Sequence, residues 1–272
     1  MSVYVLPHDN PVEEGRLGLL SSLLDPYVRF RLETLGLAKG WACLEVGAGN
    51  GSMSRWIAEC IGPSGRVVCT DLETSFLDRI VGNGIEVRPL DLVRDPILQQ
   101  SDGSGFDLIL ARNVLHHLPE RNEVISRLTG ALKPGGLLVV MEPDIGPMWA
   151  CTIPEWVFYW RAFCAWSESR DIDYKLGRSL ALRLSRAGLE AVESYGETAY
   201  LQGGRDTPTL AATGFYRDTA LAIGPQMVAD GFIDEDALDA FIRLMDRPGF
   251  RAAGYDFTMT WGRKPAVGSR AT

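Results

Sequence analysis

Residues 44–52 read LEVGAGNGS and join a short apolar run to a segment whose apolar residues have helical spacing. Glycines in such a loop allow a sharp turn and let a ligand approach the backbone closely. NAD-binding loops follow the pattern G-x-G-x-x-G, whereas here the third glycine comes one residue early. An acid, Glu45, also precedes the first glycine by two residues. The loop therefore favours a ligand that presents an amino acid carboxylate and ammonium over one that presents a pyrophosphate.

Apolar runs and helical segments alternate around this loop, from about residue 41 to residue 142. The expected strands are 41–46, 66–70, 85–90, 106–111 and 137–141, and the expected helices are 52–61, 74–81 and 119–132. Continuous apolar strands separated by helices indicate a parallel sheet that is covered on both faces. Further along, the pattern predicts a helix over 176–187, strands over 189–201 and 255–261, and helices within 208–247.

Two acids follow the next two expected strands, Asp71 after VVCT and Asp91 in RPLDL. The carboxyl ends of parallel strands meet at one crevice, where an acid after the second strand accepts the hydroxyls of a ribose. Asp91 is placed to accept from an adenine amine. Taken alone, Asp71 would equally well cap the next helix, and Asp91 would be an ordinary loop residue. Together with the glycine loop, the two acids favour a nucleotide site.

Residues 41–144 carry a series of motifs that resembles that of class I S-adenosylmethionine (SAM)-dependent methyltransferases. The motifs are LEVGAGNGS, VVCTDL, RPLDL, FDLILARNVLHHLP and LKPGGLLVVMEPD. The resemblance implies an α/β, doubly wound, mostly parallel seven-stranded sheet with helical lid and cap insertions. It implies S-adenosyl-L-methionine as the cofactor, with S-adenosyl-L-homocysteine (SAH) as the product. It also implies the following cofactor-binding residues: Glu45, Gly47, Gly49, Asp71, Asp91 and Leu92. We also predict cofactor contacts for their neighbours Ala48 and Leu72. Arg112, a strand-end residue near the donor, is predicted as a further cofactor contact, and the alternative is that it holds a backbone turn.

Residues 25–31 (DPYVRFR) are expected on an N-terminal helix packed over the cofactor. Related small-molecule methyltransferases contact the methionine carboxylate from such a helix with Tyr or Arg, which implies Tyr27 as a further cofactor contact. Tyr27 and Arg31 are one helical turn apart and share a face. The alternative is that this face is simply solvated.

Two adjacent histidines, His116 and His117, follow the fourth expected strand. Methyl transfer to an alcohol or phenol requires a general base, and a neutral imidazole has a suitable pKa. We predict that one of the pair, preferably His117, is this base and that Asp144 orients it, whereas Glu142 is structural. The alternative is that these histidines cap the next helix or pack under the loop. No metal site is expected.

The predicted organisation has five parts: an N-terminal helical segment over the cofactor site (1–40), a SAM-binding core (41–144), an aromatic lid (145–175), the C-terminal part of the core with a helical cap insertion at about 208–247 (176–262), and a mobile tail (263–272). The seven aromatic residues within 149–166 either line an acceptor pocket or pack the cap onto the core.

The 272 residues carry a formal net charge of −8, which disfavours nucleic acid as a partner. No run approaches the roughly 20 apolar residues of a membrane helix, and residues 1–15 lack the pattern of a secretory signal. We therefore expect a cytoplasmic enzyme with a small-molecule acceptor and no membrane or nucleic acid partner. The sequence leaves open whether the protein forms a homo-oligomer.

The predicted function is methyl transfer from SAM to a ring-bearing, natural-product-like molecule, most often at oxygen, with carbon or nitrogen open. One alternative is a SAM-binding enzyme of the same fold that catalyses a cyclisation or rearrangement. A regulatory module without the donor is disfavoured by the intact motif, and an NAD-dependent oxidoreductase is disfavoured by the glycine spacing.

Overall fold

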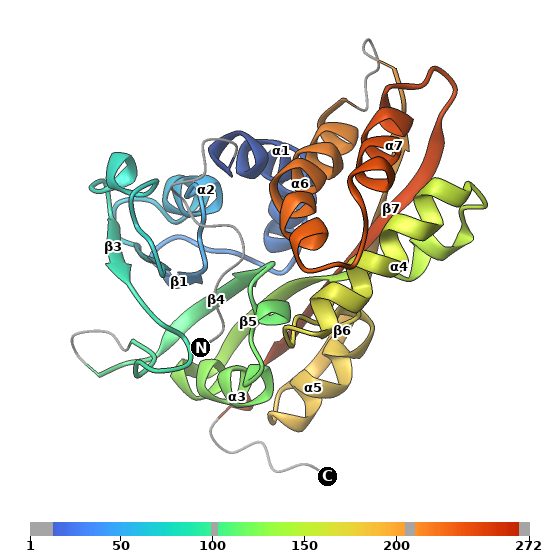
Figure 1. Cartoon of the computed structure of the whole chain (residues 1–272). Helices are drawn as coiled ribbons and strands as arrows, with labels where there is room; N and C mark the ends of the chain where they lie inside the picture. Colours follow the sequence, from blue (N-terminus) through green and yellow to red (C-terminus); the bar gives the residue numbers. More distant parts are fainter. Residues whose placement is uncertain (1–12, 99–102, 205–209, 267–272) are drawn as a thin grey trace.

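The computed structural model describes residues 13–98, 103–204 and 210–266. Seven strands form one sheet in the order β3-β2-β1-β4-β5-β7-β6 (Figure 1). β1 to β5 pair in parallel, and β7 runs antiparallel to both β5 and β6. The expected doubly wound, mostly parallel seven-stranded sheet is confirmed.

The strands are β1 Ala42–Val46, β2 Arg66–Asp71, β3 Ile85–Pro89, β4 Phe106–Arg112, β5 Leu132–Asp144, β6 Glu190–Gln202 and β7 Arg251–Arg263. The helices are α1 Glu13–Thr34, α2 Ser52–Ile61, α3 Arg121–Ala131, α4 Pro154–Glu168, α5 Leu180–Arg186, α6 Leu210–Ala229 and α7 Glu235–Asp246. The helix expected over 74–81 is wrong, because only a 3-10 turn forms there, at Asp78–Ile80. Gly82 and Gly84 follow at positive φ, a conformation that does not continue a right-handed helix.

Each face of the sheet has its own apolar core. Cys43 packs in a cluster with residues of α1 and α2, whereas its neighbour Leu44 packs in a second cluster with residues of α3 and α5. All five residues of β1 are buried, as expected where adjacent side chains of a strand point to opposite covered faces. The helices thus fix the strand ends, and the site lies along the carboxyl edge of the sheet.

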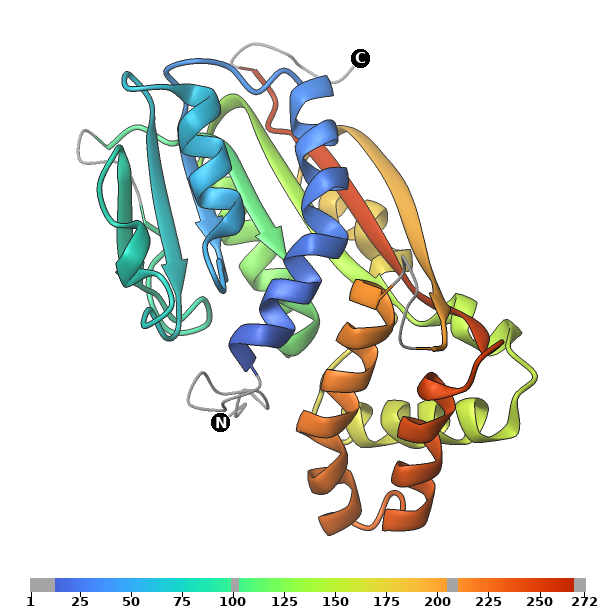
Figure 2. The ribbon, with the colours of Figure 1, turned by 90° about the horizontal axis from the view of Figure 1, so that it is seen from above.

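Three helices, α4, α6 and α7, form a cap beside this edge (Figure 2). Aromatic rings hold the cap together: Tyr159 of α4 stacks on Phe241 of α7 at 3.7 Å, and Trp160 lies edge-on to Tyr255 of β7 at 5.3 Å. The aromatic residues of α4 therefore mainly pack the cap onto the core. Two of them differ: Trp166 lines the main cavity, and Phe158 is exposed.

The parts predicted from sequence correspond to recognisable elements. α1 lies within 1–40, α4 within the predicted lid, and α6 and α7 lie between β6 and β7, near the predicted insertion. Residues 267–272 of the predicted tail lie outside the described residues. Within the described ranges, no helix has both the length and the apolar character needed to span a membrane.

Candidate active site

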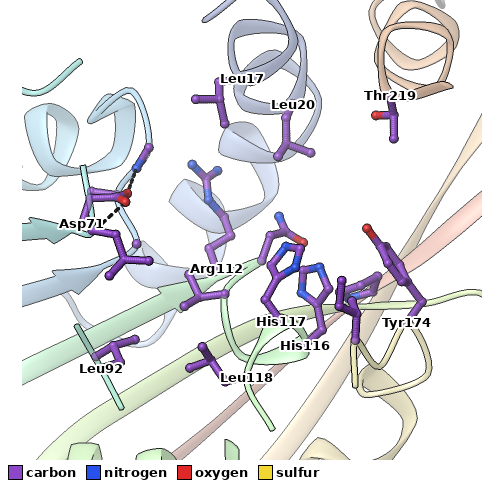
Figure 3. Close-up of a pocket in the computed structure, with 18 of the residues that line it drawn as sticks. Leu17, Leu20, Asp71, Leu92, Arg112, His116, His117, Leu118, Tyr174 and Thr219 are labelled. Atoms are coloured by element: carbon purple, nitrogen blue, oxygen red, sulfur yellow. Dashed lines mark hydrogen bonds between the residues drawn. The ribbon is translucent and has the colours of Figure 1, made fainter. Parts of the chain in front are cut away.

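A cavity of about 1370 Å³ lies at the carboxyl edge of the sheet (Figure 3). Its walls come from the loops after β1 to β4, the first half of α1, the end of α4 and one side of α6. Figure 3 shows Asp71 on one side of this space and Tyr174 and Thr219 on the other, with Arg112 and the two histidines between them. We call these sides the donor half and the acceptor half.

The glycine loop forms the floor of the donor half. Gly47 and Gly49 both have positive φ, 65° and 56°, which other residues adopt only with strain. A Cβ atom at Gly47 would also clash with the side chain of Val114. The Asp71 carboxylate holds this loop, because it accepts hydrogen bonds from the backbone N–H of Gly49 at 2.9 Å and of Leu72 at 2.7 Å.

Most of the predicted cofactor residues meet in this half. The cavity is lined by Gly47, Ala48, Gly49, Asp71, Leu72, Asp91, Leu92 and Arg112. Asp91 also makes a local turn, since its Oδ1 accepts from the N–H groups of Val93 at 2.9 Å and Arg94 at 3.2 Å. The structure thus brings together eight of the ten predicted residues.

Glu45 lies behind the cavity wall. Its buried carboxylate accepts a hydrogen bond from the Ser54 hydroxyl. Burial raises the pKa of Glu45 to about 7, while the charge of Arg112 lowers it. Arg112, which does line the cavity, forms a buried ion pair with Asp25 of α1. Glu45 therefore acts from behind the cavity wall: it bonds the start of α2 through Ser54, and its carboxylate lies near the charge of Arg112.

The structure does not place Tyr27 at the cofactor cavity. Tyr27 is 37% exposed and lines a separate cavity of about 430 Å³ between α1, β6 and α6. Arg31, on the same helix, stacks over Trp261 at 4.4 Å. The α1 residues at the main cavity are Arg16, Leu17, Leu20 and Ser21. The prediction chose the second half of the helix, whereas the first half reaches the strand ends.

His116 is held by a buried carboxylate. Its Nδ1 lies 2.6 Å from Glu142 Oε2, and Glu142 also accepts from the backbone N–H groups of Val114, Leu115 and His116. This carboxylate fixes both the turn and the ring, which is how a base is oriented in many enzymes. Nε2, on the opposite side of the ring, is the nitrogen that can act on a ligand.

Asp144 has a different role from the predicted one. It lies one pleat beyond Glu142 on β5 and forms a two-point ion pair with Arg178, with Nε–Oδ2 at 2.9 Å. It also accepts from the backbone N–H of Gly146, and it does not line the cavity. Glu142, predicted as structural, contacts the histidine instead.

The acceptor half comes mainly from residues that no motif singled out. These are Arg16, Leu17, Leu20, Trp166, Tyr174, Phe215, Thr219, Ile223, Tyr255 and Phe257, together with His116 and His117. The charges here are paired: the buried Arg16 bonds Glu13 at 2.7 Å, and Arg170 pairs with Asp230. The acceptor half is thus largely apolar with a few hydroxyl and imidazole groups.

Comparison with known proteins agrees with this geometry. Residues 44–138 match the family model of a methyltransferase domain. A 106-residue segment is 34% identical to fusarielin synthase FSL1 of Gibberella zeae, covering 36% of this chain and 4% of that protein. Another is 29% identical to the ubiquinone/menaquinone biosynthesis C-methyltransferase UbiE of Pseudomonas paraeruginosa over 42% of this chain and 46% of that protein. The chain thus matches less than half of each of these relatives.

Solved structures share the fold at low identity. The phosphoethanolamine N-methyltransferase 2 of Haemonchus contortus, in complex with SAH, has a TM-score of 0.54 at 17% identity, over 93% of this chain and 52% of that one. The [4+2]-cyclase SpnF has a TM-score of 0.52 at 18% identity, over 89% and 82% of the two chains. Residues 44–138 thus match a methyltransferase domain, and the chain shares the fold of class I SAM-dependent methyltransferases that the motif series indicated.

Proposed function

We propose that this protein transfers the methyl group of SAM to an uncharged, ring-bearing small molecule, at an oxygen atom. The observation that carries the proposal is the single cavity that joins the Asp71 loop to the Glu142–His116 pair beneath an apolar cap. One cavity is thereby able to hold a donor and an acceptor in contact, which is the main requirement of a displacement at an activated methyl group.

The donor half fits SAM by the chemistry of its groups. Asp71 is an acid at the carboxyl end of β2, held by two backbone N–H groups beside a glycine loop. It would bind the ribose hydroxyls, with Leu72 and Leu92 against the adenine. When bound, SAM supplies a methyl group on a positively charged sulfonium, which needs no further activation.

His116 would take the proton of the acceptor. Burial lowers its pKa to about 3, so that the ring is not charged on its own. With the Nδ1 proton donated to an ionised Glu142, Nε2 has the lone pair that a general base needs. With an acceptor bound, the apolar side chains of the cap would limit the access of water to this step.

The reaction rate is expected to rise about tenfold between pH 7 and pH 9. Burial raises the pKa of Glu142 to about 8, against the opposing effect of the three backbone N–H groups. Below this pH the Glu142–His116 pair holds one more proton and is not a base; above it the pair has lost that proton, and the two groups titrate together. The measurement is kcat against pH with an aliphatic alcohol acceptor, which does not ionise in this range. A rate that is flat or falls with pH contradicts the role of the pair.

The uncharged acceptor follows from the electrostatics of the acceptor half. Its two arginines, Arg16 and Arg170, are each paired with a carboxylate, and the remaining wall is largely apolar. An anionic acceptor would lose its hydration without gaining an unpaired positive charge, which is costly. A neutral ring system with a few oxygen atoms suits this wall.

Two alternatives keep the same site. Carbon methylation also needs a proton removed, and the relative UbiE is named as a C-methyltransferase. The second alternative is a cyclisation in which SAM is bound but does not react. The cyclase SpnF shares this fold, and a fold does not determine which reaction is catalysed.

The proposal is tested first by binding and then by stoichiometry. SAM and SAH are expected to raise the melting temperature by several degrees at 100 times their Kd, whereas NAD and NADP do not. Acceptors that react are expected to give one SAH per product, with the new methyl group on oxygen by NMR. If neither SAM nor SAH raises the melting temperature, the proposed cofactor site is wrong. Product formed without SAH supports the cyclisation. A new C–CH₃ signal in the NMR spectrum supports carbon methylation.

A further inference from the structure

A second cavity adjoins the acceptor half. Its volume is about 430 Å³, which is within the range of small-molecule sites. Phe257 of β7 lines both cavities, and among the described residues it is the one that does so. Because Phe257 is only 2% exposed, its ring fills the space between them. One side chain thus separates the acceptor half from a further space of ligand size.

The same two helices form walls of both cavities. α1 and α6 pack against each other (Figure 2). On α1, Ser21 lines the main cavity and the next residue, Ser22, lines the second. On α6, Phe215 lines the main cavity, and Ala212, one helical turn away, lines the second. The two cavities therefore follow one another along the α1–α6 contact, with Phe257 at their junction.

The backbone that carries Phe257 is fixed on both sides. Phe257 pairs with Pro143 of β5 on one side and with Glu197 of β6 on the other. Its ring lies 5.8 Å from that of Tyr255, which precedes it by two residues and therefore shares its face of the strand. The division between the two spaces thus depends on the position of one ring, which a side-chain rotation changes without disturbing the sheet.

The wall of the second cavity is mainly apolar and contains small side chains. Its apolar members include Leu23, Leu24, Ala199, Ala211 and Ala212. Glu197 is the one carboxylate among the described residues of this wall. Tyr27 and Tyr200 also line the cavity and are exposed, so that it opens to solvent. Small apolar side chains leave room for a narrow alkyl chain, and the carboxylate disfavours an anionic one.

We infer that the second cavity is the distal part of the acceptor site and that Phe257 is the specificity-determining residue between the two parts. The inference rests on the proposed function and narrows its substrate class: the acceptor is a ring that carries an uncharged alkyl chain. The ring lies beside His116, and the chain passes Phe257 into the second cavity. Burial of the chain there increases affinity with the apolar area that leaves water.

The test compares 4-hexylphenol with 4-methylphenol, which has the same ring and hydroxyl, by calorimetry on the complex with SAH. The wild-type protein is expected to bind the hexyl compound at least about tenfold more tightly. Ala199→Phe fills the second cavity, so that this ratio is expected to fall to about twofold or less, with the affinities for 4-methylphenol and SAH unchanged. Ala229→Phe is the matched control and keeps the ratio, because Ala229 is exposed at the end of α6 and lines neither cavity.

Phe257→Ala examines the junction itself. Without the ring, the chain enters the second cavity without displacing it, and the affinity for 4-hexylphenol is expected to rise about tenfold, against less than about threefold for 4-methylphenol. Adding Ala199→Phe to this variant is expected to abolish the gain, which shows that the two positions act on the same chain. Loss of a buried ring lowers stability, so the Ala199→Phe comparison in the wild-type background decides the question if Phe257→Ala does not fold.

The outcomes separate this inference from the proposal on which it rests. Equal affinities of the two phenols for the wild type overturn the assigned alkyl chain. An unchanged ratio in Ala199→Phe overturns the second cavity as the place of the chain. If the wild-type protein does not bind SAH at all, the proposed function fails, and the assignment of the second cavity to a methyl acceptor fails with it.

Discussion

Replacing His116 with glutamine is expected to slow methyl transfer by about two to four orders of magnitude, the usual contribution of a general base. The imidazole is the group that Glu142 orients at 2.6 Å, and an amide at this position has no basic lone pair of comparable strength. SAH affinity is expected to stay within about twofold, because His116 belongs to the acceptor side of the cavity. Single-turnover rates with saturating SAM, combined with calorimetry of SAH, measure the two effects separately.

His117→Gln and Asp144→Ala are the controls for this prediction. Sequence reasoning preferred both of these residues, but the Glu142 carboxylate contacts the ring of His116, and Asp144 pairs with Arg178. Each control is expected to slow the reaction less than about tenfold, which would be far below the effect of losing a base. A larger loss in His117→Gln than in His116→Gln would assign the proton to the neighbouring ring.

Asp71→Ala is expected to weaken SAM and SAH binding by about two to three orders of magnitude. The substitution removes charge-assisted hydrogen bonds to a ribose, each stronger than a neutral one, and it frees the N–H of Gly49 from its acceptor at 2.9 Å. The first loss weakens the complex directly, and the second loosens the loop in the free protein, so that both lower the affinity. Calorimetric titration with SAH gives the affinity directly.

Asp71→Asn separates the charge from the shape of the side chain. It keeps one oxygen acceptor of nearly the same size, and it is expected to retain an affinity between those of the wild type and the alanine variant. The melting temperature without ligand shows whether the loop held by Asp71 is still folded. An SAH affinity that does not change in either variant would remove Asp71 from the donor site.

The fold and the donor half were predictable because their signals are local. A glycine that needs positive φ, such as Gly47, and an acid at a strand end, such as Asp71, are recognisable within a few residues of sequence. The apolar runs likewise gave five of the seven strands near their observed bounds, whereas β5 and β7 begin earlier than predicted, at Leu132 and Arg251. The prediction for 74–81 was wrong: its apolar spacing is helical, but only the 3-10 turn Asp78–Ile80 forms there.

The acceptor half was much less predictable, because its residues meet only after folding. Tyr174, Thr219 and Leu17 come from three stretches far apart in the chain. The wrong assignment of Asp144 as the acid that orients the histidine has the same cause. Glu142 and Asp144 are two acids one pleat apart on β5, and the sequence alone does not distinguish them. Their neighbours, the His116 ring and Arg178, decide which acid serves the site.

The position of α6 and α7 in the chain has a consequence for how this protein can change. Both helices lie between β6 and β7, and Gln202 at the end of β6 pairs with Arg251 at the start of β7. The inserted stretch therefore leaves and re-enters the sheet at adjacent points, where changes in length cost little chain entropy. α6 supplies acceptor-side wall residues such as Phe215 and Thr219, whereas the donor loops precede it by 90 residues or more in sequence. A recombination event, or an engineer exchanging this one stretch, is thus able to alter acceptor preference in a single step and leave the donor machinery untouched.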